Sequence, residues 1–185
     1  IGLKKGKEFK FICVSRLIKD KGIVEFLEVA KMIKKKYVEV KFILIGSIDT
    51  QNISLINIDY LKKFTNKYVT HYEFNHDIKK YIIESDCAVL PSYREGTSRF
   101  LLEAASLGRP IVTTDVPGCN NIVFNNFNGY LCEKSSINSL YNAVEKMIKT
   151  PLDIRIKMSK NSRLIVEKYF DITKVNNQII NDLKL

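Results

Sequence analysis

Short apolar runs alternate with longer amphipathic stretches along this chain. Residues 9–14 (FKFICV), 41–46 (KFILIG) and 87–90 (CAVL) have the length and apolar character of buried strands. Between the first two, apolar residues recur every three or four positions. That spacing predicts a helix at about 21–37, with an inner face made of Ile23, Phe26, Leu27, Ala30 and Ile33.

The same alternation continues to the end of the chain. A further strand is expected near 68–74, and the chain offers six strand candidates in all. Further helices are expected at about 55–64, from 78, and at 100–107, 137–148, 152–169 and 172–183, with a short one after the turn at 116–121. The alternation predicts an α/β fold with one doubly wound, Rossmann-like parallel sheet. No repeat or Pro/Gly-rich linker divides the 185 residues, so we expect a single domain.

The stretch 91–108 carries the strongest candidate chemistry. It follows the strand at 87–90, begins with a polar turn and continues as a helix that Gly108 ends. A turn between a strand and a helix lies at the carboxyl edge of a parallel sheet, where α/β folds bind ligands. Thr97 or Ser98 can cap the helix, and the unpaired N–H groups of its first turn suit a phosphate. The spacing alone allows two interpretations of Glu95 and Glu103. Either both carboxylates bind a ligand, or Glu95 is a solvated turn residue and Glu103 a charge on the helix surface.

The loop after the first strand lies at the same edge and contains Arg16 and Lys21. Arginine can hold a phosphate through two hydrogen bonds, and lysine supplies a mobile point charge. By position alone, either could instead be a solvated side chain.

Glu95 and Glu103 form a Glu-x7-Glu pair inside Pro-Ser-x-x-Glu-Gly…Leu-Leu-Glu-Ala. This pattern resembles the nucleotide-sugar motif of glycosyltransferase family 4, whose members are retaining enzymes of the GT-B fold. Residues 108–115 resemble the family's next strand, and 128–131 resemble its following turn. The family also carries an Arg and a Lys-Gly after the first strand, as Arg16, Lys21 and Gly22 do here. The resemblance spans about 9–169.

The resemblance implies a role for each matching residue. Arg16 and Lys21 would stabilise the leaving nucleoside diphosphate, Glu95 would hold donor-sugar hydroxyls and Glu103 the ribose hydroxyls. Catalytic roles thus fall on Glu95, Arg16 and Lys21, and donor binding on Arg16, Lys21, Gly22, Gly96, Thr97, Ser98, Arg99 and Glu103. The chain has no Asp-x-Asp triplet, so we expect no metal and no cofactor beyond the donor.

The resemblance also implies that the chain is the carboxyl-terminal half of a two-domain enzyme. Its terminal helices, about 152–183, would pack back on an absent amino-terminal domain that supplies the acceptor site. Pro117-Gly118-Cys119 and 95–99 (EGTSR) are similar to a subset that builds bacterial surface polysaccharides, such as capsule and lipopolysaccharide, on polyprenyl-diphosphate carriers. That subset uses UDP-linked hexoses or N-acetylhexosamines, which makes a UDP-sugar the expected donor.

The net charge of +10 favours an anionic partner. No nucleic-acid motif accompanies the lysines, so we expect phosphorylated ligands, and peripheral contact with the inner face of the cytoplasmic membrane, rather than nucleic acid. Four widely spaced cysteines match no metal site or disulfide framework and indicate buried free thiols in the cytoplasm.

Three other functions stay open at this point. The chain could be a non-catalytic nucleotide-sugar-binding module, a glycogen-synthase-like GT-B enzyme, or a polyanion-binding protein driven by its charge. The last predicts binding that weakens steeply with salt and does not depend on Glu95.

Overall fold

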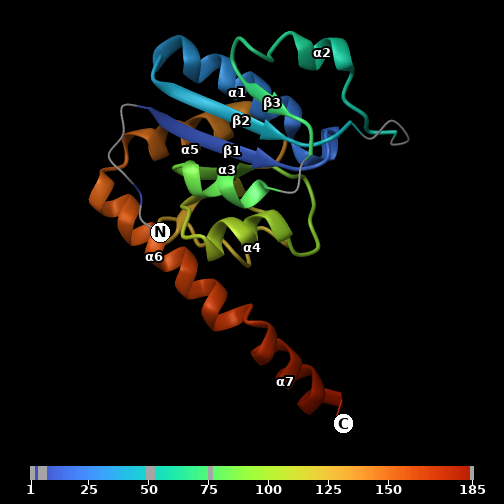
Figure 1. The fold of residues 1–185 in the computed structure, drawn as a ribbon, viewed down its shortest axis with the longest axis vertical. Helices are drawn as coiled ribbons and strands as arrows, with labels where there is room; N and C mark the ends of the chain where they lie inside the picture. Colours follow the sequence, from blue (N-terminus) through green and yellow to red (C-terminus); the bar gives the residue numbers. More distant parts are fainter. Residues whose placement is uncertain (1–2, 4–7, 49–52, 75–76, 184–185) are drawn as a thin grey trace.

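A computed structural model of the chain describes residues 3, 8–48, 53–74 and 77–183, without the side chains of 177–179 and 182–183 (Figure 1). The described strands form one six-stranded sheet in the order β3-β2-β1-β4-β5-β6, and every pairing is parallel. Their bounds are β1 Phe9–Val14, β2 Val40–Ile45, β3 Thr70–Tyr72, β4 Cys87–Leu90, β5 Ile111–Thr114 and β6 Gly129–Cys132. The expected doubly wound sheet is confirmed.

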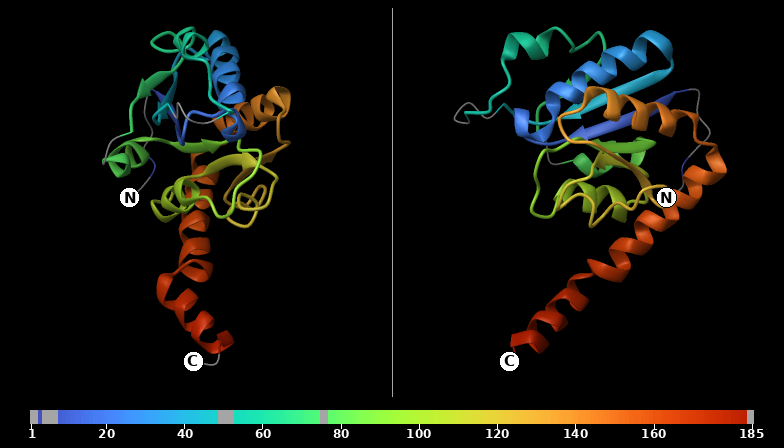
Figure 2. Two further views of the ribbon diagram at one scale, coloured as in Figure 1. Left: turned by 90° about the vertical axis from the view of Figure 1, so that its right-hand side faces the viewer. Right: turned by 180° about the vertical axis from the view of Figure 1, so that it is seen from behind.

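Helices cover both faces of this sheet (Figures 1 and 2). Helix α1 (Ile23–Lys36) packs against α5 (Ile137–Lys149) on one face, and α4 (Arg99–Ser106) packs against α6 (Leu152–Tyr169) on the other. Strands β4 and β5 are buried at every position, as expected of central parallel strands covered on both sides. The remaining helices are α2 (Ile58–Lys62), α3 (Ile78–Glu84) and α7 (Ile172–Leu183).

Several boundaries differ from those expected. Helix α1 begins at Ile23 instead of residue 21, because a 3-10 turn (η1, Lys19–Lys21) precedes it and Gly22 adopts a left-handed conformation. Helix α2 and strand β3 are shorter than the sequence indicated, and β3 pairs only with Ile43–Ile45. The helix expected after 116–121 is absent from that described segment. Turns stand there, and Gly118 has a φ of 83°, outside the helical region.

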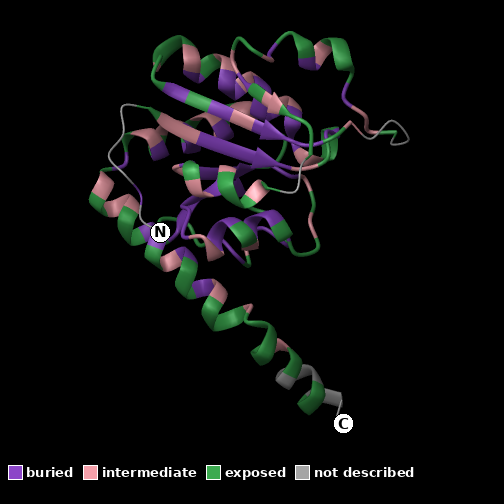
Figure 3. Ribbon diagram, in the orientation of Figure 1, coloured by how far each residue is buried: buried purple, intermediate pink, exposed green. Residues whose placement is uncertain are grey.

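The two terminal helices have the expected bounds but different surroundings. One side of α6 is buried against the domain through Met158, Ser159, Ser162 and Ile165. Helix α7 extends away from the sheet, and its described side chains are largely exposed (Figures 1 and 3). Ile172 and Ile180 are 70% and 47% exposed although both are apolar. In the described part of the chain, no helix is long and apolar enough to cross a bilayer.

Candidate functional site

The site forms where β1 and β4 lie side by side. The chain leaves β1 towards β2 on one side and leaves β4 towards β5 on the other, so the strand order reverses between them. Loops leaving the carboxyl ends of such a strand pair diverge and create a crevice, which is where open α/β sheets bind ligands. The two loops here are 15–22 and 91–98. The sequence predicted both loops at this edge, and the structure brings them together.

Backbone contacts hold the two loops against each other. The N–H of Tyr93 donates to the carbonyl of Asp20 at 2.8 Å. Gly22 has a φ of 68°, and a Cβ at this position would lie closer than 3.0 Å to the Pro91 carbonyl oxygen. Only glycine combines this conformation with such a close approach. The packing of the two loops therefore requires glycine at position 22.

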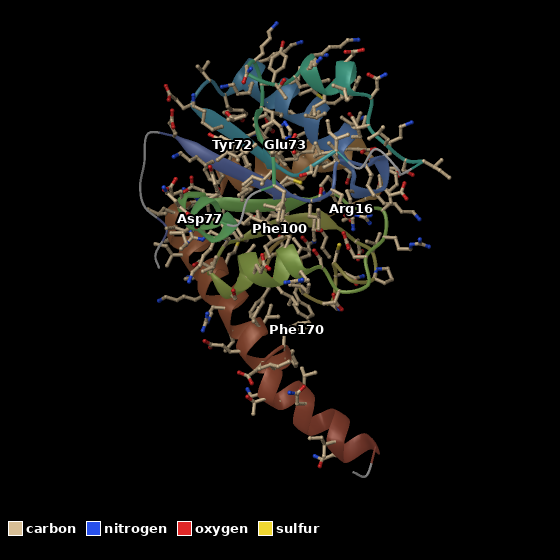
Figure 4. The ribbon with its side chains drawn as sticks, turned by 45° about the vertical axis from the view of Figure 1, so that its right-hand side comes forward. Arg16, Tyr72, Glu73, Asp77, Phe100 and Phe170 are labelled. Atoms are coloured by element: carbon tan, nitrogen blue, oxygen red, sulfur yellow. The ribbon has the colours of Figure 1, made fainter. Side chains whose placement is uncertain are left out.

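Two predicted site residues meet directly. Lys21 Nζ lies 2.6 Å from Glu95 Oε1, and their side chains are 19% and 11% exposed. A third side chain, Ser92, donates its hydroxyl to the same Oε1 at 2.7 Å. Arg16 is exposed on the loop that carries Lys21, and Figure 4 shows it at the carboxyl end of the strands. A carboxylate and two cations therefore share one edge of the sheet.

The turn that carries Glu95 leads into the positive end of α4. Ser98 is the N-cap, and its hydroxyl accepts a hydrogen bond from the N–H of Leu101 at 3.3 Å. Among the described residues, no acceptor lies within hydrogen-bonding distance of the N–H groups of Thr97 and Arg99. Gly96 is exposed, and a Cβ there would meet nothing within 4 Å. An anion could approach this backbone closely.

Ser98 is bonded within the protein instead of facing a ligand. Its N–H donates to the Gly118 carbonyl at 3.2 Å, its hydroxyl caps the helix, and the residue is 4% exposed. The expectation that its amide is among the outward-facing donors therefore needs correction. The physical reason is that the segment after β5 lies against the turn, where the Gly118 carbonyl accepts the hydrogen bond from the Ser98 N–H. Thr97 and Arg99, by contrast, are both exposed.

Glu103 lies on the exposed side of α4, beyond the turn that carries Glu95. Among the described residues, no hydrogen bond or ion pair joins its carboxylate to Glu95, Lys21 or any other side chain. The two members of the Glu-x7-Glu pair therefore have different surroundings, since one is held by protein groups and the other faces solvent.

Three residues that shape the site were not among the predicted site residues. Ser92 bonds Glu95, and Gly118 lies under the turn, where a Cβ would come within 2.6 Å of the Glu95 carbonyl carbon. Tyr93 donates its hydroxyl to buried Glu25 at 2.5 Å, which ties the turn to the first turn of α1. A Ser and a Tyr beside the motif glutamate were visible in the sequence, but their partners come from the tertiary structure.

All four cysteines are free and buried, as expected. Burial raises the pKa of Cys13, at the end of β1, to about 12. Burial also raises the pKa of Cys119, which follows Gly118. Both thiols are therefore neutral at physiological pH and act as small apolar groups.

No cluster of three or more His, Cys, Asp or Glu side chains suited to a metal occurs among the described residues. The expectation that no metal takes part stays a prediction.

Known proteins resemble this chain along nearly its whole length. Residues 1–165 match the family model described as "Glycosyl transferases group 1". The chain belongs to this family. The resemblance read from the Glu-x7-Glu pattern is thereby confirmed at the level of the family and its fold.

Two similar proteins are bacterial glycosyltransferases. The capsular polysaccharide biosynthesis glycosyltransferase CapM of Staphylococcus aureus is 33% identical over 157 residues, covering 85% of this chain and 41% of CapM. The Escherichia coli UDP-Gal:alpha-D-GlcNAc-diphosphoundecaprenol alpha-1,3-galactosyltransferase is 31% identical over 176 residues, covering 94% and 44%. The chain thus spans less than half the length of these two relatives.

A solved structure supports the fold. The crystal structure of Anabaena HepE in complex with UDP superposes with a TM-score of 0.83 at 22% identity, covering 96% of this chain and 49% of HepE. At this identity the likeness establishes the GT-B half-fold alone.

Proposed function

We propose that this chain is the donor-binding half of a retaining glycosyltransferase. The enzyme transfers a hexose or N-acetylhexosamine from a nucleotide-sugar, with UDP as the nucleotide, to a glycan or a polyprenyl-diphosphate-linked acceptor. The observation that carries the proposal is the contact of Lys21 with Glu95 between β1 and β4, beside the amino terminus of α4. The name of the Escherichia coli relative, a UDP-Gal:alpha-D-GlcNAc-diphosphoundecaprenol alpha-1,3-galactosyltransferase, supports UDP and a lipid-diphosphate acceptor.

The diphosphate lies between the first loop and the start of α4 in this proposal. Arg16 and Lys21 supply positive charge from one side, and the N–H groups of Thr97 and Arg99 supply hydrogen-bond donors from the other. Negative charge grows on the diphosphate as its bond to the sugar breaks. Donors that are already in place stabilise that charge without reorganising, which lowers the barrier. The open space over Gly96 lets the diphosphate reach the backbone.

The two glutamates hold different parts of the donor. Glu95 is fixed by Lys21 and Ser92 and accepts hydrogen bonds from sugar hydroxyls. Glu103 is free to accept from the ribose hydroxyls. Holding the donor at both ends fixes the anomeric carbon for attack on the face that the leaving group vacates, as retention requires. Bond cleavage and acceptor attack require no metal in this proposal.

The acceptor binds to the half of the enzyme that lies outside this chain. In this proposal α6 and α7 pack back on that half, and the exposed apolar side chains of Ile172 and Ile180 become buried there. The free thiols and the charge of +10 support a cytoplasmic enzyme that contacts the inner face of the membrane peripherally. The family relatives support bacterial surface polysaccharide as the product.

Calorimetric titration of UDP, GDP and ADP into the chain, at two salt concentrations, tests the proposal. Glu103→Ala and Arg16→Ala should each weaken UDP binding. Matched controls are Glu84→Ala, at the far end of α3, and Arg163→Ala on α6, which make the same charge changes elsewhere. Binding that follows salt alone and ignores all four variants would instead indicate a polyanion-binding protein.

Transfer separates an enzyme half from a binding module. The chain alone should bind UDP but transfer no sugar, because donor and acceptor meet between two domains. Joined to the other half, it should transfer, and Glu95→Gln should abolish that transfer. Unchanged transfer by Glu95→Gln would remove Glu95 from the mechanism, and UDP binding without transfer by the joined protein would favour a non-catalytic module.

A further inference from the structure

Ser92 is a buried polar residue with one specific task. Ser92 is 0% exposed, and its hydroxyl donates a hydrogen bond to Glu95 Oε1 at 2.7 Å. A fully buried hydroxyl that bonds a charged group contributes more than one that bonds a neutral group. Ser92 directly follows Pro91, at the start of the loop 91–98 and two residues after the end of β4.

The backbone that carries Ser92 is fixed by the neighbouring strand. Thr113 Oγ1 donates to the Leu90 carbonyl at 2.6 Å, and the hydroxyl of Thr114 donates to the Ser92 carbonyl. Both threonines are buried at the end of β5. The Ser92 hydroxyl is therefore an anchored donor, because the segment that bears it is held by two side-chain bonds besides the sheet ladder.

Ser92 and Lys21 donate to the same oxygen of Glu95. Lys21 Nζ is 2.6 Å and Ser92 Oγ 2.7 Å from Oε1. Within the described part of the chain, no hydrogen bond reaches the other oxygen, Oε2. Two donors on one oxygen fix the rotation of the carboxylate and leave Oε2 as its available acceptor.

We infer that Ser92 is a positioning residue that holds Glu95 so that Oε2 meets the donor sugar. This inference rests on the proposed function, in which Glu95 accepts from sugar hydroxyls. It also resolves a conflict between two tasks of Lys21, which pairs with Glu95 here and contacts the diphosphate in the donor complex. When Lys21 turns towards the diphosphate, Ser92 keeps its bond to Oε1 and Glu95 does not swing away.

The experiment measures how much more tightly the chain binds a UDP-sugar than UDP alone. We would measure Kd for UDP, UDP-glucose and UDP-N-acetylglucosamine with Ser92→Ala and with the wild-type chain. Ser92→Ala should keep UDP affinity within about twofold, because UDP does not touch Glu95 in this arrangement. The ratio of the UDP Kd to the UDP-sugar Kd should fall towards one. A merely structural role would instead weaken all three ligands together.

Two further variants keep the test decisive. Ser92→Cys keeps the size of the side chain but is a weak donor, so it should fall between wild type and Ser92→Ala in the sugar-dependent ratio. Ser85→Ala is the matched control, because Ser85 is also buried and donates one hydrogen bond, to the Tyr81 carbonyl at 2.8 Å. It should leave the ratio unchanged. A Ser92→Ala chain with an unaltered sugar-dependent ratio would overturn the inference.

A ligand-free measurement separates this inference from the proposed function. The carboxyl carbon of Glu95 should shift its NMR resonance in Ser92→Ala and keep it in Ser85→Ala. If wild type binds UDP-sugars no better than UDP, the sugar role of Glu95 fails, and this resonance still reports whether Ser92 holds the carboxylate. An unmoved Glu95 resonance in folded Ser92→Ala would refute the positioning role on its own.

Discussion

Gly118→Ala should both destabilise the fold and displace the donor turn, the loop 91–98 that is proposed to bind the donor. Gly118 has a φ of 83°, a conformation that costs an alanine about 1–2 kcal/mol. Its Cβ would also lie 2.5 Å from the Glu95 carbonyl oxygen and 2.6 Å from the carbonyl carbon, so the backbone of the turn must move. At roughly 2–4 °C per kcal/mol for a chain of this size, the conformational cost alone lowers Tm by about 2–8 °C.

Gly96→Ala is the matched contrast, because it makes the same glycine-to-alanine change at a residue that lies next to Gly118. Gly96 is not among the glycines with positive φ, and a Cβ there meets nothing within 4 Å. The folded chain can accept this methyl group. Because alanine also lowers the conformational entropy of the unfolded chain, the substitution should raise the free energy of unfolding by about 0.4–1 kcal/mol. The same methyl enters the space proposed for the diphosphate. A forced overlap of about 1–3 kcal/mol would weaken UDP binding roughly 5- to 150-fold.

Thermal unfolding followed by circular dichroism, with UDP titration of each variant, measures both effects. The expected pattern is a lower Tm for Gly118→Ala, and an equal or higher Tm with weaker UDP binding for Gly96→Ala. If Gly96→Ala bound UDP as tightly as wild type, the diphosphate would not lie over this turn. If Gly118→Ala left Tm unchanged, the reasoning from its backbone angle and contacts would be refuted.

Two other outcomes follow from charge and burial. Hydrogen bonds from Lys149, Lys36 and Tyr141 lower the pKa of Glu145 from 4.5 to about 2, so its contribution to stability is present above pH 4.5 and lost as the pH falls towards 2. Glu145→Gln should therefore unfold more easily than wild type in urea at pH 7, with the difference closing between pH 4.5 and 2; a difference that persists at pH 2 would contradict this pairing. The four buried cysteines should react with a thiol reagent at pH 8 only after urea is added, because burial raises their pKa values, and rapid labelling of the folded chain would contradict their burial.

Long, strongly patterned elements could be predicted from the sequence, and short ones could not. The bounds of α6 and α7 follow from uninterrupted helical spacing after Pro151 and Asp171. Helix α2 spans only Ile58–Lys62, and it begins at a cap formed by the Asn57 side chain, which accepts from the N–H groups of Asp59 and Tyr60. A one-turn helix has too few apolar repeats for its ends to be read from spacing.

The candidate site, too, could be predicted from the sequence only in part. The sequence placed Arg16, Lys21 and Glu95 in loops at one edge of the sheet, because strand and helix order decides the edge. It could not show that Lys21 and Glu95 touch, since this requires β1 and β4 to be neighbours although 74 positions separate the two residues. Nor could it show that Ser98 is bonded internally, because its partner Gly118 comes from the segment after β5.

The contacts that assemble the candidate site join described residues of this chain. The first loop meets the donor turn through the Tyr93–Asp20 backbone bond and the close packing of Gly22 on Pro91. The donor turn meets the segment after β5 through the bond from Ser98 to Gly118. Contacts of this kind between backbones allow little adjustment, so the geometry is set before any ligand arrives. Donor binding should therefore survive separation of the two halves, whereas transfer should not, because the site proposed for the acceptor belongs to the other half.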